Sequence, residues 1–152
     1  MKSEVTTDER SIRIKRVFQA PRPLVYSWWT DGSKLQQWSG CKEATNCRVE
    51  MDFRVGGGFT QTMQIAGAGA FTLRGRYLEI VENERIVYSA DLGPVTTRVT
   101  VEFFEHEGGT KVVLTHEGLP DEFLRNTISQ GTAESFDKLD TAVGSRAVAV
   151  LP

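Results

Sequence analysis

The sequence has few of the residue types that build metal centres and disulfide frameworks. Only two cysteines, Cys41 and Cys47, and two histidines occur among 152 residues. The spacing of the cysteines, with no histidine nearby, is not a zinc pattern, so we predict neither a metal nor a cofactor. Because the first ten residues contain no apolar signal core, we expect a cytoplasmic protein in which both thiols are free.

A strong net charge and long apolar runs are also absent. The 18 basic and 20 acidic side chains give a formal net charge of -2 at pH 7 and are interspersed along the chain. This balance excludes the basic surface typical of nucleic-acid-binding proteins. No apolar run approaches the ~18 residues that a membrane-spanning helix needs. We therefore predict no nucleic-acid partner and no membrane association.

The glycine-rich stretches lack the features of nucleotide-binding loops. Residues 56–58 are three glycines without the lysine and the serine or threonine of a phosphate loop, and Gly67 and Gly69 are followed by Thr72 where the dinucleotide fingerprint has its third glycine. Ser135 has no nucleophile elbow around it. We interpret the glycines as turns and assign no catalytic residue.

What the chain does contain is enough apolar sequence for one folded domain. Its hydrophobic content is 39% and its charged content 25%, both ordinary for a protein with a packed core. Residues 1–10 are polar and are predicted to be a disordered tail. Residues 11–152 are predicted to form a single domain, because no linker or internal repeat divides them.

The last thirty residues predict one long helix that begins at Asp121. Asp121 and Glu122 place negative charge where the helix dipole favours it. Asp137 and Asp140 lie off the apolar stripe and are expected to face solvent. The residues of the stripe recur at steps of three or four, as on one helical face: Ile128, Thr132, Phe136, Leu139, Val143 and Ala147.

Almost everything before this helix predicts strands. Alternation of apolar and polar residues indicates strands over 11–18, 45–53, 59–65, 70–81, 85–91, 96–104 and 110–117. Two short helices are predicted over 24–30 and 34–38, the second capped near Asp31. Because short turns join consecutive strands, they pair antiparallel. The predicted fold class is α+β, with a curved antiparallel sheet of about seven strands around a long C-terminal helix.

Several stretches, taken in order, resemble one known family. They are RVFQAPRPLVYSWWTDGSKLQQW from Arg16, DFRVGGGF from Asp52, GRYLEIVENERIVYS from Gly75, VTVEFFEHEGGTKVVLTHEGL from Val99 and SFDKLDTAV from Ser135. Together they look like the activator of ninety-kilodalton heat-shock-protein ATPase homologue family, which belongs to the START-like, or SRPBCC, helix-grip superfamily. The likeness covers about residues 11–143.

The resemblance implies a helix-grip fold that encloses a hydrophobic pocket between the sheet and the last helix. It implies no conserved catalytic motif, and relatives include co-chaperone domains and antibiotic-sequestering proteins. The family usually has a tryptophan at the position of Thr132 and a second one near Trp38, at the position of Ser39. Both departures remove aromatic bulk, and we expect them to enlarge the pocket.

A set of bulky residues is predicted to line this pocket, the usual form of a small-molecule site. For each of them, plain packing in the core is the alternative interpretation. The predicted ligand-binding residues of this kind are Trp28, Trp29, Trp38, Phe59, Met63, Phe71, Tyr77, Tyr88, Phe123, Ile128 and Phe136.

Three polar residues are candidates for contact with a ligand. His116 shares strand parity with Val112 and Leu114, so its side chain is predicted to point inward and, once buried, to be neutral at pH 7. Gln61 and Arg16 also share parity with apolar neighbours and are predicted to reach the cavity. The alternative for all three is a structural role, such as an internal hydrogen bond.

The leading functional hypothesis is non-catalytic binding of a small apolar or aromatic molecule. The alternative is a co-chaperone-like interaction module that engages a protein partner. A third hypothesis is an enzyme of the cyclase or hydrolase type, with His116 or Glu79 as the acid or base. A closed cavity favours the first hypothesis, whereas a filled core with an exposed apolar strip favours the second.

Overall fold

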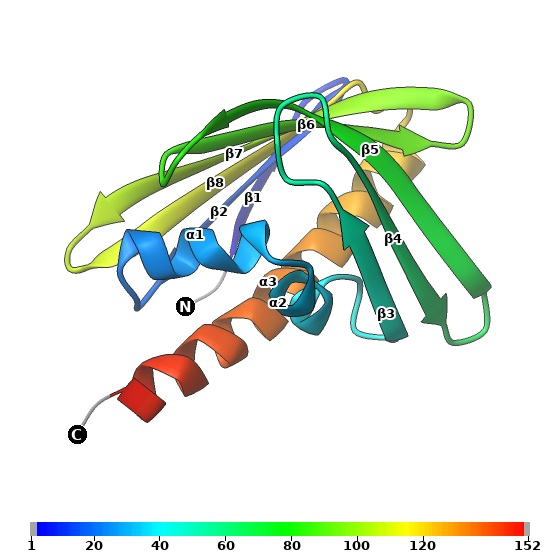
Figure 1. Ribbon diagram of the computed structural model, residues 1–152. Helices are drawn as coiled ribbons and strands as arrows, with labels where there is room; N and C mark the ends of the chain where they lie inside the picture. The colour runs from blue at the N-terminus through cyan, green and yellow to red at the C-terminus, as the bar shows by residue number, and fades with distance from the viewer. Residues whose placement is uncertain (1–2, 151–152) are drawn as a thin grey trace.

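The computed structural model describes residues 3–150, with side chains for residues 3–144. Over these residues the chain forms one eight-stranded antiparallel sheet and three helices (Figure 1). In chain order the elements are β1 (Glu4–Thr7), β2 (Ser11–Phe18), α1 (Arg22–Thr30), α2 (Gly32–Trp38), β3 (Ala44–Met51), β4 (Gly58–Ile65), β5 (Gly69–Val81), β6 (Arg85–Leu92), β7 (Val95–His106), β8 (Gly109–Glu117) and α3 (Glu122–Val150).

This architecture confirms the predicted α+β class, with one strand more than expected. Strand β1 lies in the segment that the sequence predicts as a disordered tail, so that prediction is wrong for residues 4–7. All four side chains of β1 are exposed, so the strand has no alternating burial for a sequence pattern to reveal. Its backbone instead pairs antiparallel with β2, for example Val5 opposite Ile14.

The sheet curves around helix α3, which crosses its concave side (Figure 1). The strand order is β1-β2-β8-β7-β6-β5-β4-β3, so β2 pairs with β8, far along the chain, and β1 forms one edge. The predicted apolar stripe of α3 is confirmed for Phe136, Leu139 and Val143, which are almost completely buried. The side chain of Ala147 lies outside the described side chains.

Helices α1 and α2 close one end of the sheet. The Asp31 carboxylate accepts a hydrogen bond from the Ser33 backbone N–H at 2.9 Å and so caps α2, as predicted. Behind these helices Trp29 meets Trp38 and Phe103 edge-on, with ring centroids 4.7 and 5.1 Å apart. Such edge contacts between aromatic rings stabilise a close-packed core, so the rings hold α1 and α2 against each other and against the sheet.

Arg16 ties the sheet to α3 instead of reaching a cavity. Its guanidinium, on β2, donates to the Asp137 carboxylate and, at 3.0 Å, to that of Asp140. The Arg16 side chain is 5% exposed, whereas the side chains of Asp137 and Asp140 are 69% and 38% exposed. The prediction that Arg16 reaches the cavity is therefore wrong, because its guanidinium is held by two carboxylates far along the chain.

Two further predictions concern the cysteines and membrane-spanning helices. Cys41 and Cys47 are both free thiols. Among residues 3–150, no helix combines the length and the apolar character needed to cross a membrane.

Candidate ligand-binding site

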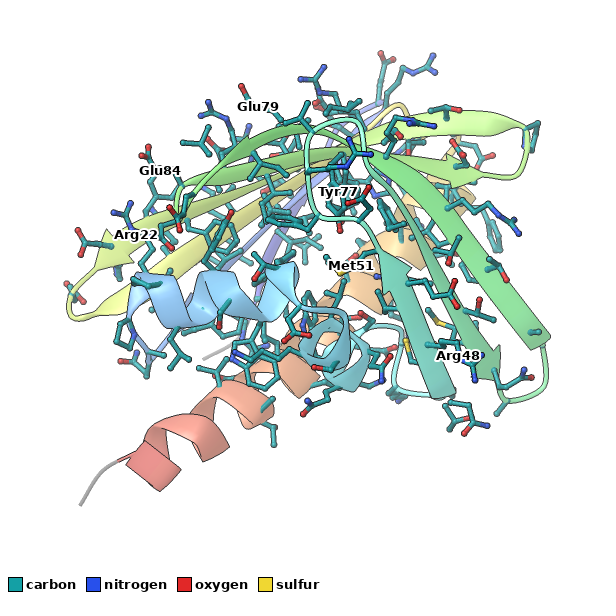
Figure 2. All side chains as sticks on the ribbon, in the orientation of Figure 1. Arg22, Arg48, Met51, Tyr77, Glu79 and Glu84 are labelled. Carbon is teal, nitrogen blue, oxygen red and sulfur yellow. The ribbon has the colours of Figure 1, made fainter. Side chains whose placement is uncertain are left out.

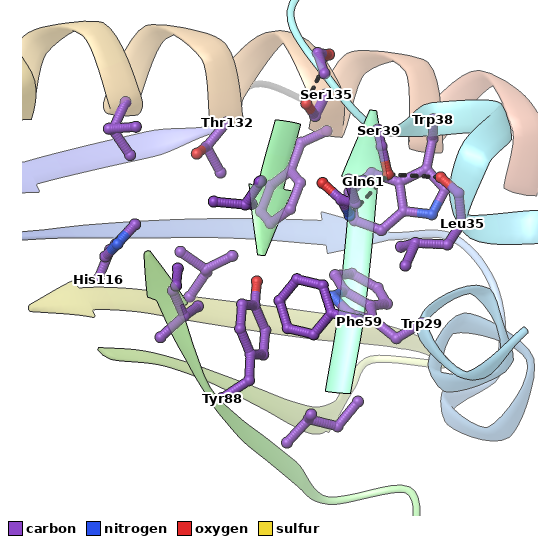
Figure 3. Close-up of a pocket in the computed structure, with 18 of the residues that line it drawn as sticks. Trp29, Leu35, Trp38, Ser39, Phe59, Gln61, Tyr88, His116, Thr132 and Ser135 are labelled. Atoms are coloured by element: carbon purple, nitrogen blue, oxygen red, sulfur yellow. Dashed lines mark hydrogen bonds between the residues drawn. The ribbon is translucent and has the colours of Figure 1, made fainter. Parts of the chain in front are cut away.

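A cavity of about 170 Å³ lies between the concave face of the sheet and the N-terminal half of α3 (Figure 3). It is partly open, and Phe71, which is 43% exposed, lies at its rim. The walls are mainly apolar. The residues that line the cavity are Trp29, Leu35, Trp38, Ser39, Gly40, Phe59, Gln61, Phe71, Leu73, Tyr77, Ile86, Tyr88, Ala90, Leu92, Val99, Leu114, His116, Ile128, Thr132, Ser135 and Phe136.

Most of the predicted site residues lie in this wall. Their position is thus as expected, while their role in binding stays a prediction. The predicted residues that line the cavity are Trp29, Trp38, Phe59, Gln61, Phe71, Tyr77, Tyr88, His116, Ile128 and Phe136.

Three predicted site residues lie elsewhere. Trp28 is buried on another side of α1, where the Lys34 ammonium lies 5.6 Å from its ring centroid. Met63 is buried against Gly40, at which an added Cβ would lie 2.8 Å from the Met63 sulfur. Phe123, in the first turn of α3, is 78% exposed. The sequence-based assignment of these three to the cavity is therefore wrong.

Aromatic rings from β4, β5 and β6 form one wall of the cavity. The ring centroid of Phe59 lies 5.4 Å from that of Tyr77 and 5.3 Å from that of Tyr88. Glycine at position 75 permits this packing, because a Cβ there would lie 2.4 Å from the Phe59 ring and 2.0 Å from the Ser89 carbonyl oxygen. Burial raises the pKa of both tyrosines. Each phenol therefore keeps its proton at neutral pH, and Figure 3 shows the Tyr88 hydroxyl pointing into the space below α3.

His116 forms the polar end of the cavity. Its imidazole is buried, as predicted, and its Nε2 lies 2.7 Å from the Thr97 hydroxyl oxygen. Thr97 in turn donates to the Ala90 carbonyl oxygen at 2.8 Å. Burial lowers the pKa of His116 to about 4, because desolvation disfavours the charged form. The prediction of a neutral imidazole at pH 7 is confirmed.

The serines and Gln61 border the cavity near α2. Ser39 donates to the Leu35 carbonyl oxygen at 2.6 Å and is 3.5 Å from the Gln61 amide nitrogen. Ser135 donates to the Gly40 carbonyl oxygen at 2.7 Å. These hydroxyl protons are thus used within the protein and are unavailable to a ligand.

Ser39 and Thr132 both border the cavity. These are the two positions where the resemblance leads one to expect tryptophan. An indole at either position would occupy part of the 170 Å³. The expectation that the small residues enlarge the pocket agrees with their location.

Several lining residues were not singled out from the sequence. Leu114 shares strand parity with His116, and Leu73 lies directly opposite Gln61 in the β4–β5 register. Strand parity therefore carried a signal for both. Ala90 and Gly40 carried none, because a small residue at a cavity wall has the same local pattern as one in a filled core.

The structure also tests the other chemical groups considered above. Glu79 is exposed and pairs with Arg85 at 2.6 Å on the outside of the sheet (Figure 2), so it contributes nothing to the cavity. Away from the cavity, ligand atoms of Cys41, Glu43 and Glu134 lie within 4.8 Å of one another. The Glu134 carboxylate already accepts hydrogen bonds from the backbone N–H of Lys42 and from the side-chain amide of Gln130.

A curved antiparallel sheet that grips a long C-terminal helix above an apolar cavity defines a helix-grip, or START-like, protein. The chain belongs to the activator of Hsp90 ATPase homolog 1-like protein family, whose model matches residues 19–144. This finding confirms the resemblance seen in the sequence. No curated protein matches the chain significantly.

Solved structures from several bacteria share the fold. A protein of Chromobacterium violaceum is 29% identical, with 88% of this chain and 96% of that chain covered and a TM-score of 0.82. One from Rhizobium leguminosarum is 26% identical, with 95% and 97% covered and a TM-score of 0.73. A Rhodobacter sphaeroides protein is 17% identical, with 95% and 99% covered and a TM-score of 0.83, a likeness that concerns the fold alone.

Proposed function

We propose that the protein binds a small hydrophobic or aromatic molecule in the cavity between the sheet and α3. The observation that carries this proposal is the cavity itself, about 170 Å³ of space with mainly apolar walls. An apolar cavity of about 150 Å³ in another protein accommodates benzene, so the space suits roughly one aromatic ring with a small substituent.

The energetics support a role for the space. Unfilled volume in a protein core lowers stability by roughly 24 cal/mol per Å³, so about 170 Å³ corresponds to a loss of up to about 4 kcal/mol. Larger side chains at Thr132 or Ser39 would recover part of this loss. A ligand that fills the space would recover it only while bound, which links binding to stability.

The family membership is compatible with a protein partner as well. The large exposed apolar side chains are Val5, Val55, Phe71, Leu78, Phe104 and Phe123. Those on the sheet belong to β1, β5 and β7, which are not neighbours in the strand order. They form no continuous strip along adjacent strands of the described sheet, so the cavity supports ligand binding better than it supports a protein interface.

Isothermal titration calorimetry with p-xylene as the ligand tests the proposal. The wild-type protein is expected to bind with a Kd between the micromolar and millimolar ranges, about −8 to −4 kcal/mol. Thr132→Trp places an indole in the cavity and is expected to weaken binding at least tenfold without lowering the melting temperature. Thr127→Trp, on an exposed position of the same helix, is the matched control and should bind as the wild type does. Equal affinity of all three proteins would refute the proposal.

A further inference from the structure

The hydrogen bonds around His116 determine which ring nitrogen carries the proton. The Thr97 hydroxyl has one proton and donates it to the Ala90 carbonyl oxygen at 2.8 Å. The Thr97 oxygen therefore acts as an acceptor toward His116 Nε2, which lies 2.7 Å away. It follows that Nε2 bears the proton of the neutral imidazole and that Nδ1 carries a lone pair.

This lone pair belongs to the wall of the cavity. His116 lines the cavity, and within residues 3–144 no hydrogen bond reaches its Nδ1. Figure 3 shows the imidazole extending from β8 toward the part of α3 that carries Thr132. Nδ1 is not among the buried polar atoms without a partner in the described part of the chain, so it is accessible from the cavity. A ligand that donates to Nδ1 replaces the hydrogen bond that water makes there, whereas an apolar ligand displaces the water and leaves the acceptor unpaired.

The charges around the cavity restrict the ligand further. Among the described residues that line it, none is a lysine or an arginine. Arg16 is paired with Asp137 and Asp140. The Lys138 ammonium lies outside the lining, 3.5 Å from the Ser39 carbonyl oxygen, and donates to the Cys41 carbonyl oxygen at 2.8 Å. A carboxylate in this cavity would lose its hydration without gaining a positive partner, which is strongly unfavourable.

We infer that the cavity selects a neutral, single-ring aromatic molecule with a hydroxyl or N–H group, a phenol being the simplest case, whose proton is accepted by His116 Nδ1. This inference rests on the proposed function and adds the chemical class of the ligand. The Tyr88 hydroxyl, which also points into the cavity (Figure 3), supplies a donor for the oxygen of such a ligand.

Three para-substituted toluenes test the inference: p-cresol, p-xylene and p-toluate, which carry a hydroxyl, a methyl or a carboxylate group opposite the common methyl group. The measured quantity is the ratio of the Kd of p-xylene to the Kd of p-cresol. His116→Leu removes the acceptor and is expected to lower this ratio about tenfold. His106→Leu changes the other histidine, at a turn outside the cavity, and should leave the ratio unchanged. The wild-type protein should bind p-toluate at least tenfold more weakly than p-cresol.

Nitrogen NMR of the imidazole tests the same inference on the wild-type protein, without relying on how His116→Leu folds. The free protein should show the Nε2–H tautomer of His116, with the His106→Leu variant providing the assignment. Addition of p-cresol should shift the Nδ1 resonance toward that of a hydrogen-bonded acceptor, and p-xylene should not.

The failures of the two proposals are distinguishable. If p-xylene and p-cresol both bind but the Kd ratio is the same in wild type and His116→Leu, the inference about ligand class is wrong and the proposed function stands. Tightest binding of p-toluate, or an Nδ1–H tautomer, would also overturn the inference alone. If none of the three probes binds, both proposals are wrong.

Discussion

The two halves of helix α3 meet different surroundings. In the C-terminal half Leu139 and Val143 are almost completely buried, and Asp137 with Asp140 binds the Arg16 guanidinium of β2. The N-terminal half has an exposed Phe123, and Ile128 and Thr132 border open space. One half therefore anchors the helix on the sheet while the other roofs a cavity. The comparison explains how a fold can keep unfilled volume and still hold together.

The largest expected effect is on the stability of the anchored half. Phe136, where the two halves meet, also borders the cavity, but its ring is fully buried and in edge contact with Phe18, at a centroid distance of 5.8 Å. Phe136→Ala is therefore expected to lower the free energy of unfolding by about 3–5 kcal/mol. Phe123→Ala makes the same change at a site that is 78% exposed and should lower it by less than about 0.5 kcal/mol. Urea denaturation measures both. Similar losses in the two variants would contradict the division of α3 into two halves.

Removal of both carboxylates that pair with Arg16 is expected to be nearly as severe. In the double variant Asp137→Ala, Asp140→Ala the guanidinium of Arg16, whose side chain is 5% exposed, is left without a counter-charge, at an expected loss of about 3 kcal/mol. Arg16→Met should lower stability by only about 1 kcal/mol, because the carboxylates it leaves behind are reached by water. Chemical denaturation compares the two, and a larger loss in Arg16→Met would argue against this account of the pair.

His116, in the cavity wall on β8, should make the stability of the protein depend on pH. The pKa of this imidazole is about 4 in the folded protein and about 6.5 when unfolded. Between these values the unfolded state binds more protons, so stability is expected to fall as the pH drops from about 6.5 to about 4. The loss attributable to His116 is roughly 2–3 kcal/mol.

The readout is the difference in pH dependence between the wild type and His116→Leu, since other groups titrate in both proteins. His116→Leu should lack this component of the acid destabilisation. Parallel stability curves for the two proteins from pH 7 to pH 4 would show that the histidine is not held neutral by burial.

The smallest expected effect lies outside α3. Asp31→Ala removes the cap of α2, whose carboxylate accepts from the Ser33 backbone N–H at 2.9 Å, and should lower stability by about 1 kcal/mol. Because α2 carries Trp38 into the cavity wall, binding of p-xylene should weaken little if the helix persists. Thermal melts and a binding titration of the same sample check both statements, and a loss above that of Phe136→Ala would be inconsistent with a simple cap.

The sequence predicts most of the fold because its signals are local. Alternation along strands placed His116 and Gln61 on the inner face, and the spacing along α3 placed Phe136 against the sheet. Arg16 was also placed inward by parity. Its partners were not predicted, because they lie 121 and 124 residues away and no local pattern reports such a distance.

The errors in the predicted site have a common physical origin. Parity and helical spacing give the face of an element but not how far along that face the cavity extends. Met63 and Trp28 are buried beyond its limits, and Phe123 lies in the first turn of α3, where it is exposed to solvent. The volume of the cavity itself depends on small residues such as Thr132, which the comparison with the family made visible and the chain alone did not.

Nuclear Overhauser effects from bound p-xylene to protein methyl groups test the central claim most directly, since they report both binding and its location. The account predicts contacts to the methyl groups of Thr132, Ile128 and Leu114, which line the cavity, and none to those of Leu139 or Val143 in the anchored half of α3. Contacts confined to the exposed surface, or no contact at saturating p-xylene, would contradict a ligand cavity beneath the N-terminal half of the helix.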